Sequence, residues 1–242
     1  MDTSADAGAP VELPPRHGEY RLGIFGSMMN PPHRGHHALV DAVHRACGLH
    51  RVMVVPAGIP PHRRAPEVSP RARLTMAVRA FADLDHVVVS DSEVDRGESG
   101  DVGYMIDTVD EALEIPQLLG YDDLRVRIWL IVGADQVATL TTWHRWEELS
   151  RRVTLAVVGR PDLLADGTLQ AEVAALRAAG TVVEVVEMEP IAISSTQVRD
   201  AARRGDRAAV AELVPDAIVE DVLHLYGADR ATAPLPDAAE GQ

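Results

Sequence analysis

Short runs of β-branched and aliphatic residues alternate with helical patterns along most of the chain, and this alternation constrains its fold more than any other feature. Val126–Val132 is almost continuously apolar, as expected of a strand whose sheet is covered by helices on both faces. Strand and helix signals that alternate in this way predict an α/β domain with a doubly wound parallel sheet. The expected strands, in chain order, are Arg21–Phe25, Arg51–Val55, His86–Ser90, Val126–Val132, Val153–Val158 and Val182–Val186.

Several of the expected helices carry start or stop signals. Ser69 followed by Pro70 is typical of a helix start, because serine caps the first turn and proline fits its first position. Met105–Leu119 is expected to be helical, and Ser195–Tyr226 is expected to form further helices that end at Gly227. In an open parallel sheet, ligands bind beyond the carboxyl ends of the strands. Functional residues are therefore expected in the turns that follow strands.

The length and composition predict one domain with disordered ends. The 242 residues suffice for a medium α/β domain with a sizeable core. Residues 1–19 and 228–242 are rich in alanine, proline and acidic residues and show no periodicity, so we expect a disordered leader and a disordered tail. The expected domain spans residues 20–227.

The charge and the cysteine content narrow the class of partner. A formal net charge of −14 disfavours a nucleic-acid backbone or an anionic membrane as the main partner. The single cysteine, Cys47, excludes an internal disulfide and fits a reducing cytoplasm. No apolar run approaches the roughly 20 residues of a membrane span, and the N-terminus lacks a secretory pattern. We therefore expect a cytoplasmic protein that acts on small molecules, and a homo-oligomer is compatible with the sequence.

The turn after the first strand combines glycines with histidines where a helix is expected to start, in Gly23–His37 (GIFGSMMNPPHRGHH). The first N–H groups of a helix have no internal partners and, together with the helix dipole, favour an anion. His33 and His36 add donors near that point, and Gly35 lets a phosphate approach the backbone closely. The local pattern therefore predicts a triphosphate cradle.

Two other interpretations of this turn stay open. The histidines can simply be solvated, or His33, His36 and His37 can bind zinc. Histidine triples without cysteine or carboxylate companions rarely bind zinc well, so we prefer the phosphate interpretation.

A second candidate cluster lies late in the chain, at Ile193–Arg199 (ISSTQVR). Ser194, Ser195 and Thr196 resemble capping residues at the start of a helix. Arg199 follows one turn into that helix and can reach back to the capping region. Hydroxyls, helix N–H groups and a guanidinium together make a second anion clamp. Taken alone, however, the segment is better explained as a plain N-cap with a solvent-facing arginine.

The two clusters together form the pattern of the nucleotidyltransferase superfamily with a HIGH-type motif, in which an HxGH turn follows the first strand and an ISSTxxR segment comes late. More narrowly, the chain resembles bacterial nicotinate-nucleotide adenylyltransferases from about residue 21 to 227. The resemblance implies a Rossmann-like fold with a C-terminal helical segment. Four further segments match the family in order: Pro56–Arg63 (PAGIPPHR), Gly103–Thr108 (GYMIDT), Val132–Leu149 (VGADQVATLTTWHRWEEL) and Val157–Pro161 (VVGRP).

The resemblance implies a direct transfer of AMP from ATP to nicotinate mononucleotide, a step of NAD biosynthesis. The 5′-phosphate of the acceptor attacks the α-phosphorus of ATP in line, and pyrophosphate leaves with Mg²⁺, which arrives with ATP. Such a reaction needs little covalent chemistry from the protein, and alignment of the reactants is worth roughly 7–11 kcal/mol. No metal ligand of the protein is implied.

The same resemblance assigns residues to the ATP half of the site. His33 and His36 contact the phosphates, and His36 stabilises the α-phosphate as it becomes five-coordinate. Arg199 acts from the other side, on the β- and γ-phosphates. Asp135 hydrogen-bonds to the ribose, although it can equally be a helix N-cap. The implied ATP-binding residues besides these catalytic ones are Gly26, Ser27, Gly35, Asp135, Arg160, Ser195 and Thr196.

The acceptor half is assigned on the same basis. Trp143 resembles the family tryptophan that stacks on the pyridine ring, although it can equally belong to the core, where we expect Trp146. The implied acceptor-binding residues are His62, Arg63, Tyr104, Met105, Thr108 and Trp143.

The chain departs from the family pattern mainly near the acceptor half. Met28 replaces Thr, Met29 replaces Phe and Asn30 replaces Asp in the first motif, Arg63 replaces Lys, and Met105 replaces Thr. Arginine keeps the charge of lysine but changes its geometry, and methionine is flexible and suits a reshaped pocket. Two hypotheses follow: an acceptor pocket remodelled for nicotinamide mononucleotide or another pyridine nucleotide, or neutral drift within the ordinary enzyme.

Other functions stay open as alternatives. The acceptor can be phosphopantetheine, the donor can be CTP, or the domain can bind nucleotides without catalysis. A tRNA-ligase fragment is disfavoured by the net charge and by the lack of room for an RNA-binding domain. A Rossmann dehydrogenase is disfavoured because no GxGxxG follows the first strand.

Overall fold

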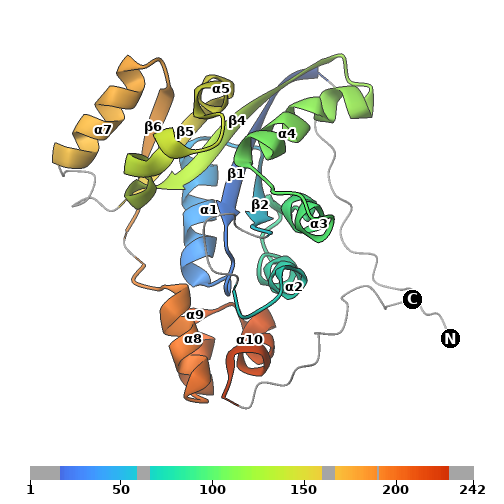
Figure 1. Ribbon diagram of the computed structural model, residues 1–242, viewed down its shortest axis with the longest axis vertical. Coiled ribbons are helices and arrows are strands. Elements are labelled where there is room, and N and C mark those ends of the chain that lie inside the picture. The colour runs from blue at the N-terminus through green and yellow to red at the C-terminus, as the bar shows by residue number, and fades with distance from the viewer. Residues whose placement is uncertain (1–16, 59–65, 160–166, 190, 229–242) are drawn as a thin grey trace.

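A single parallel sheet organises the chain in the computed structural model, which describes residues 17–58, 66–159, 167–189 and 191–228 (Figure 1). Its six strands lie in the order β3-β2-β1-β4-β5-β6. Because the strand order reverses between β1 and β4, a ligand crevice is expected at their carboxyl ends. The strands are β1 (His17–Ser27), β2 (Arg51–Pro56), β3 (Val87–Val89), β4 (Asp123–Gly133), β5 (Val153–Gly159) and β6 (Val182–Glu187).

Helices connect the strands and cover both faces of the sheet. Those within the sheet region are α1 (Arg34–Ala46), α2 (Pro70–Ala80), α3 (Ser92–Glu98), α4 (Met105–Leu119), the 3₁₀ helix η1 (Ala134–Thr142), α5 (Trp146–Arg152) and α7 (Gly167–Ala178). The C-terminal helical segment comprises α8 (Ser195–Arg203), α9 (Arg207–Leu213), the short 3₁₀ turn η2 (Asp216–Ile218) and α10 (Val219–Tyr226). None of the described helices is long and apolar enough to cross a membrane.

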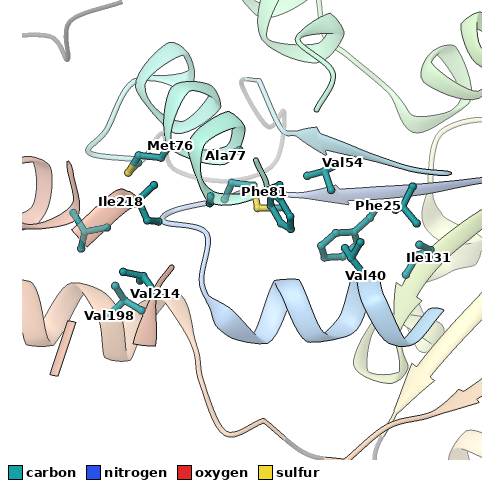
Figure 2. Close-up of a cluster of buried hydrophobic side chains, with 14 of the residues drawn as sticks. Phe25, Val40, Val54, Met76, Ala77, Phe81, Ile131, Val198, Val214 and Ile218 are labelled. Atoms are coloured by element: carbon teal, nitrogen blue, oxygen red, sulfur yellow. The ribbon is translucent and has the colours of Figure 1, made fainter. Parts of the chain in front are cut away.

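The hydrophobic core is split by the sheet into two layers. Successive residues of a strand point to opposite faces, so Ile24 and Phe25 of β1 belong to different layers. One layer joins the sheet to α1, α2 and the C-terminal helices α8–α10. The other joins it to α4, α5, α7 and η1. Figure 2 shows the first layer, in which Met76 of α2 lies near Ile218 where the C-terminal segment joins the core.

All six expected strands are present, but β1 and β4 extend well beyond their expected starts. Residues 17–19 of β1 pair with residues 123–125 of β4, so both strands start earlier than predicted. The prediction of disorder through residue 19 is therefore wrong for His17, Gly18 and Glu19. These polar residues become strand because a distant segment offers them backbone partners, which local composition does not reveal. Residues 1–16 and 229–242 lie outside the described part of the chain.

The helices predicted from clear start signals or periodic patterns are present in the structure. Met105–Leu119 forms a helix with those bounds, and the Ser69 hydroxyl accepts a hydrogen bond from Ala72 N–H at 3.2 Å. Gly227 ends α10, although with an extended backbone and not the left-handed one that often follows a helix. The short helices α3 and α5 were not expected, since seven residues are too few for a clear periodic pattern.

Candidate active site

A cavity of about 340 Å³ lies beyond the carboxyl ends of β4 and β5, beside the start of α1. Its wall includes His33 and His36 from the turn into α1, Asp135 from the start of η1, Gly159 at the end of β5 and Ile193 before α8. The strand ends and the N-terminus of α1 therefore surround one space, as the sheet order requires.

His33 and His36 form a stacked pair at the entrance of α1. Their ring centroids are 3.7 Å apart, and the backbone N–H of His33 donates to Nδ1 of His36 at 3.2 Å. Because Nδ1 accepts a hydrogen bond, the proton of a neutral His36 ring is assigned to Nε2. Nε2 lies 3.5 Å from the Ser27 hydroxyl. His36 thus has one oriented N–H donor beside the end of β1.

Both histidines are neutral at physiological pH in this arrangement. Burial, with a smaller contribution from the neighbouring His37, lowers the pKa of His33 to about 4. Burial also lowers the pKa of His36, with smaller contributions from His33 and His37. His37 itself stacks on Phe81, with ring centroids 4.7 Å apart. Within the described residues, no group of three His, Cys, Asp or Glu side chains could hold a metal ion, so the zinc interpretation gains no support.

Gly35 lies between the His33 ring and the segment before α8. A Cβ at this position would be 3.0 Å from Nδ1 of His33 and 3.6 Å from the carbonyl oxygen of Ile193. The closest neighbour of this glycine is therefore the histidine ring of the same turn, and the approach of a phosphate to its backbone stays a prediction.

The late serine–arginine cluster is tied directly to the turn between β1 and α1. The Ser195 hydroxyl donates to the Pro31 carbonyl at 2.9 Å, and Arg199 donates to the Asn30 carbonyl at 2.7 Å. Arg199 also donates to the Thr196 hydroxyl at 3.0 Å. Ser194 is the N-cap of α8, as expected. The interpretation of Arg199 as solvent-facing is wrong, because its guanidinium reaches back across the helix start.

Asp135 covers the end of β4. Its carboxylate folds back so closely that a Cβ on Gly133 would lie 2.4 Å from Oδ1. The N-cap of η1 is Gly133, so the interpretation of Asp135 as the cap is wrong. The side chain is exposed and lines the cavity, where its oxygens are available to hydroxyl groups of a ligand.

None of the described acceptor residues lines this cavity. The methyl group of Met105 lies over the end of β1, 2.5 Å from where a Cβ on Gly26 would be. Tyr104, the N-cap of α4, stacks on His144 with ring centroids 4.0 Å apart. Thr108 is buried one turn later. Trp143 lines a separate hollow of about 610 Å³ together with Trp146.

The burial of the individual tryptophan and methionine side chains could not be predicted from the sequence. Trp143 and Trp146 both pack, partly buried, against the second core layer, whereas Trp129 is the tryptophan buried within the sheet. Met29 has no exposed surface and belongs to the first core layer. A role for Met29 in reshaping the acceptor pocket is therefore not supported, and Met28 is half-buried.

Three predicted site residues, His62, Arg63 and Arg160, lie outside the described residues.

Two residues near the site were missed by sequence reasoning. Arg73 of α2 is fully buried and donates to the carbonyls of Met28 and Gly58 at 2.5 and 2.9 Å. Tyr226 of α10 donates its hydroxyl to Oδ1 of Asn30 at 2.7 Å. Both side chains form hydrogen bonds with residues that are distant in the sequence. No local sequence pattern indicates such contacts.

The cytidylyltransferase-like family model matches residues 24–201, which include both clusters that the sequence predicts to bind phosphate. Proteins named probable nicotinate-nucleotide adenylyltransferase are similar over nearly their whole length. That of Pseudomonas paraeruginosa is 34% identical over 86% of this chain and 98% of the relative. That of Laribacter hongkongensis is 33% identical over 88% of this chain and 96% of the relative.

Solved structures show the same fold at low sequence identity. The Plasmodium falciparum nicotinic acid mononucleotide adenylyltransferase complexed with NaAD aligns with a TM-score of 0.64 and 13% identity, over 86% of this chain and 98% of that one. A putative nicotinate-nucleotide adenylyltransferase from Vibrio parahaemolyticus aligns with a TM-score of 0.57 and 17% identity, over 84% and 99%. The family model matches more than half of the chain, and the bacterial relatives match it over most of its length. The chain therefore belongs to the nicotinate-nucleotide adenylyltransferase family of cytidylyltransferase-like proteins.

Proposed function

We propose that the protein transfers AMP from ATP to nicotinate mononucleotide and releases nicotinate adenine dinucleotide and pyrophosphate. One observation carries the proposal. His33 and His36 follow the turn between β1 and α1, and Ser195 and Arg199 hydrogen-bond to carbonyls of that same turn. Segments from the two ends of the chain that carry hydrogen-bond donors thus meet at one turn beside the cavity, an arrangement that suits an extended triphosphate. The acceptor follows from the names of the bacterial relatives. The buried, single Cys47 fits the reducing cytoplasm in which we place the reaction.

The protein contributes alignment and donors to the transfer. A phosphate oxygen of the acceptor forms a bond to the α-phosphorus of ATP, and the bond from that phosphorus to the pyrophosphate oxygen breaks. The Nε2–H of a neutral His36 donates to the α-phosphate as negative charge develops on it. Loss of one such donor typically costs about 3–4 kcal/mol of transition-state stabilisation.

Magnesium enters this reaction as part of the substrate, MgATP. Mg²⁺ usually keeps several waters and is held by substrate phosphates with one or two carboxylates. Asp135 and Glu189 both line the cavity wall, so carboxylates are available there. This donor set is compatible with an ion that arrives with ATP.

The test is pyrophosphate release from MgATP with nicotinate mononucleotide, nicotinamide mononucleotide and phosphopantetheine in parallel. We expect strong preference for nicotinate mononucleotide, and a fall in kcat of about 100- to 1,000-fold in His36→Ala. His50→Ala, which alters a histidine outside the cavity, is the matched control. Release with none of the three acceptors, or full turnover by His36→Ala, would contradict the proposal.

One observation favours nicotinamide mononucleotide as a second candidate acceptor. Met105 places an apolar methyl group against Gly26, where the family pattern has threonine. A neutral ring amide tolerates such a neighbour better than a carboxylate does, because an apolar surface cannot solvate charge. If this acceptor is preferred, Met105→Thr should shift the ratio of kcat/KM values back toward nicotinate mononucleotide. Met76→Leu, in the core beneath α2, should leave the ratio unchanged.

A further inference from the structure

The strands β1 and β2 run in parallel to the edge of the active site and then separate. Their paired register reaches Ser27 opposite Pro56, and the Ala57 N–H donates to the Ser27 carbonyl at 2.9 Å. Beyond this point the backbone ladder ends. One segment continues into the turn that carries His33, and the other continues past Gly58 toward the segment of His62 and Arg63.

The guanidinium of Arg73 spans the two segments just beyond the last backbone hydrogen bond. Nη1 donates to the Met28 carbonyl at 2.5 Å, and Nη2 donates to the Gly58 carbonyl at 2.9 Å. The planar fork of arginine can hold two separate acceptors in fixed geometry, which the single ammonium of lysine cannot do. Arg73 therefore extends the pairing of β1 and β2 by one further link, made by a side chain.

Stability alone does not account for an arginine in this place. Arg73 is 0% exposed, and among the described residues no carboxylate forms an ion pair with it. Its Nε also lacks a hydrogen-bond partner there. Burial of an unpaired cation is costly, and here it lowers the pKa of the guanidinium, which Tyr226 and Glu93 only partly offset. A well-packed apolar side chain would be expected to stabilise the fold better.

Gly58 is fixed from its other side by α3. A Cβ on Gly58 would lie 2.2 Å from the carbonyl oxygen of Glu93, so no larger residue fits without a shift of the backbone. The carboxylate of Glu93 also accepts a hydrogen bond from the Gly58 backbone. Gly58 is thus held between Arg73 and Glu93, at the base of the segment that the family resemblance assigns to the acceptor.

We propose that Arg73 is a positioning residue, which sets the spacing between the turn after β1 and residues 56–58, the described start of the segment that the family resemblance assigns to the acceptor. The proposal rests on the proposed function, since it concerns the alignment of the same two reactants. Arg73 touches neither reactant and acts through the backbone of Met28 and Gly58. In a transfer that depends on alignment, a displacement of about 1 Å can cost 100-fold in rate without loss of binding.

The first test is the kinetic pattern of Arg73→Lys, which keeps the charge but cannot bridge both carbonyls. We expect kcat to fall by about 100-fold, with little change in KM for MgATP. Gly58→Ala keeps Arg73 but displaces the other end of the link, and should give the same pattern. The matched controls are Arg79→Lys, on the same helix but paired with Asp221, and Gly167→Ala, where a Cβ meets no atom within 4 Å.

A second readout does not depend on turnover. Amide hydrogen exchange should increase in residues 28–31 and 56–58 of Arg73→Lys and stay unchanged in α4. If the wild-type protein transfers AMP to none of the acceptors, the proposed function fails. Amide hydrogen exchange alone then decides whether Arg73 positions the two segments. If Arg73→Lys has a normal kcat per folded molecule but a reduced thermal stability, the role of Arg73 is only structural. That result would overturn the proposal. Unchanged exchange in both segments would overturn it as well.

Discussion

Burial controls the charge of the two histidines at the centre of the site. His33 and His36 stack at the start of α1, and burial lowers the pKa of each below that of a free histidine. Because the rings are neutral in the free protein, they do not repel the positive charge of Arg199. Their N–H groups can still donate hydrogen bonds. A bound triphosphate reverses the balance, because a nearby negative charge favours the protonated ring.

Binding of a non-hydrolysable ATP analogue is therefore expected to take up protons. The pKa of His33 is about 4 in the free protein and rises in the complex, so the complex holds more protons between those two values. Affinity should consequently increase as the pH falls through that window toward about 4. Isothermal titration calorimetry at pH 6, in buffers with different ionisation heats, measures the uptake. His33→Asn should reduce it and His50→Gln should not, and identical binding heats in every buffer would refute the prediction.

At the scale of elements, the turn between β1 and α1 is held by three helices. Arg73 of α2 binds the carbonyl of Met28, Ser195 and Arg199 of α8 bind the two carbonyls that follow Met29, and Tyr226 of α10 binds the Asn30 side chain. The turn has little regular structure of its own, so its shape depends on these donors. The helices α2, α8 and α10, which pack on the first core layer, therefore also help to shape the turn that we propose binds ATP.

Tyr226→Phe tests whether α10 contributes to that shape. The change leaves the Asn30 oxygen without its partner, which should cost about 1–3 kcal/mol of stability and raise KM for MgATP. Thermal unfolding and steady-state kinetics measure the two effects. In a double-mutant cycle with Asn30→Ala, the effects should be strongly non-additive. Additive effects would show that the hydrogen bond between the two side chains does not matter.

The elements that sequence reasoning found are those with local signals. The strands showed as runs of valine and isoleucine, α2 showed through Ser69 and Pro70, and the phosphate clusters showed as helix starts with polar donors. The contacts of Arg73 and Tyr226 could not be found this way, since their acceptors lie 45 and 196 residues away in the sequence. The start of β1 was missed for the same reason, because residues 17–19 are strand only by pairing with β4.

At the scale of the whole molecule, the C-terminal segment is an integral part of the first core layer. Val198, Val214 and Ile218 are fully buried there, together with Met76 and Ala77 of α2 (Figure 2). The partly buried ion pair between Arg79 and Asp221, at 2.8 Å, joins α2 to α10. The helix α8, which carries Ser195 and Arg199, therefore shares a hydrophobic core with the sheet and is not a separate unit.

Ile218→Ala is expected to destabilise the protein by about 2–5 kcal/mol, because it leaves a cavity where α2 meets the C-terminal segment. Urea denaturation gives this value. Since Ile218 does not face the crevice, kcat measured well below the unfolding transition should stay normal. Leu118→Ala, at a side chain that is 78% exposed on α4, is the control and should have little effect on stability. A small loss of stability in Ile218→Ala would show that the C-terminal helices are only loosely joined to the sheet.

The hydrogen bond between Arg199 and Asn30 joins residues that are 169 positions apart. During synthesis, a ribosome-bound chain can therefore display the histidine turn long before the arginine that faces it has been translated. A nascent chain at that stage lacks Ser195 and Arg199, whose hydrogen bonds hold the turn in the folded protein. The turn therefore takes its final shape only after α8 has been made.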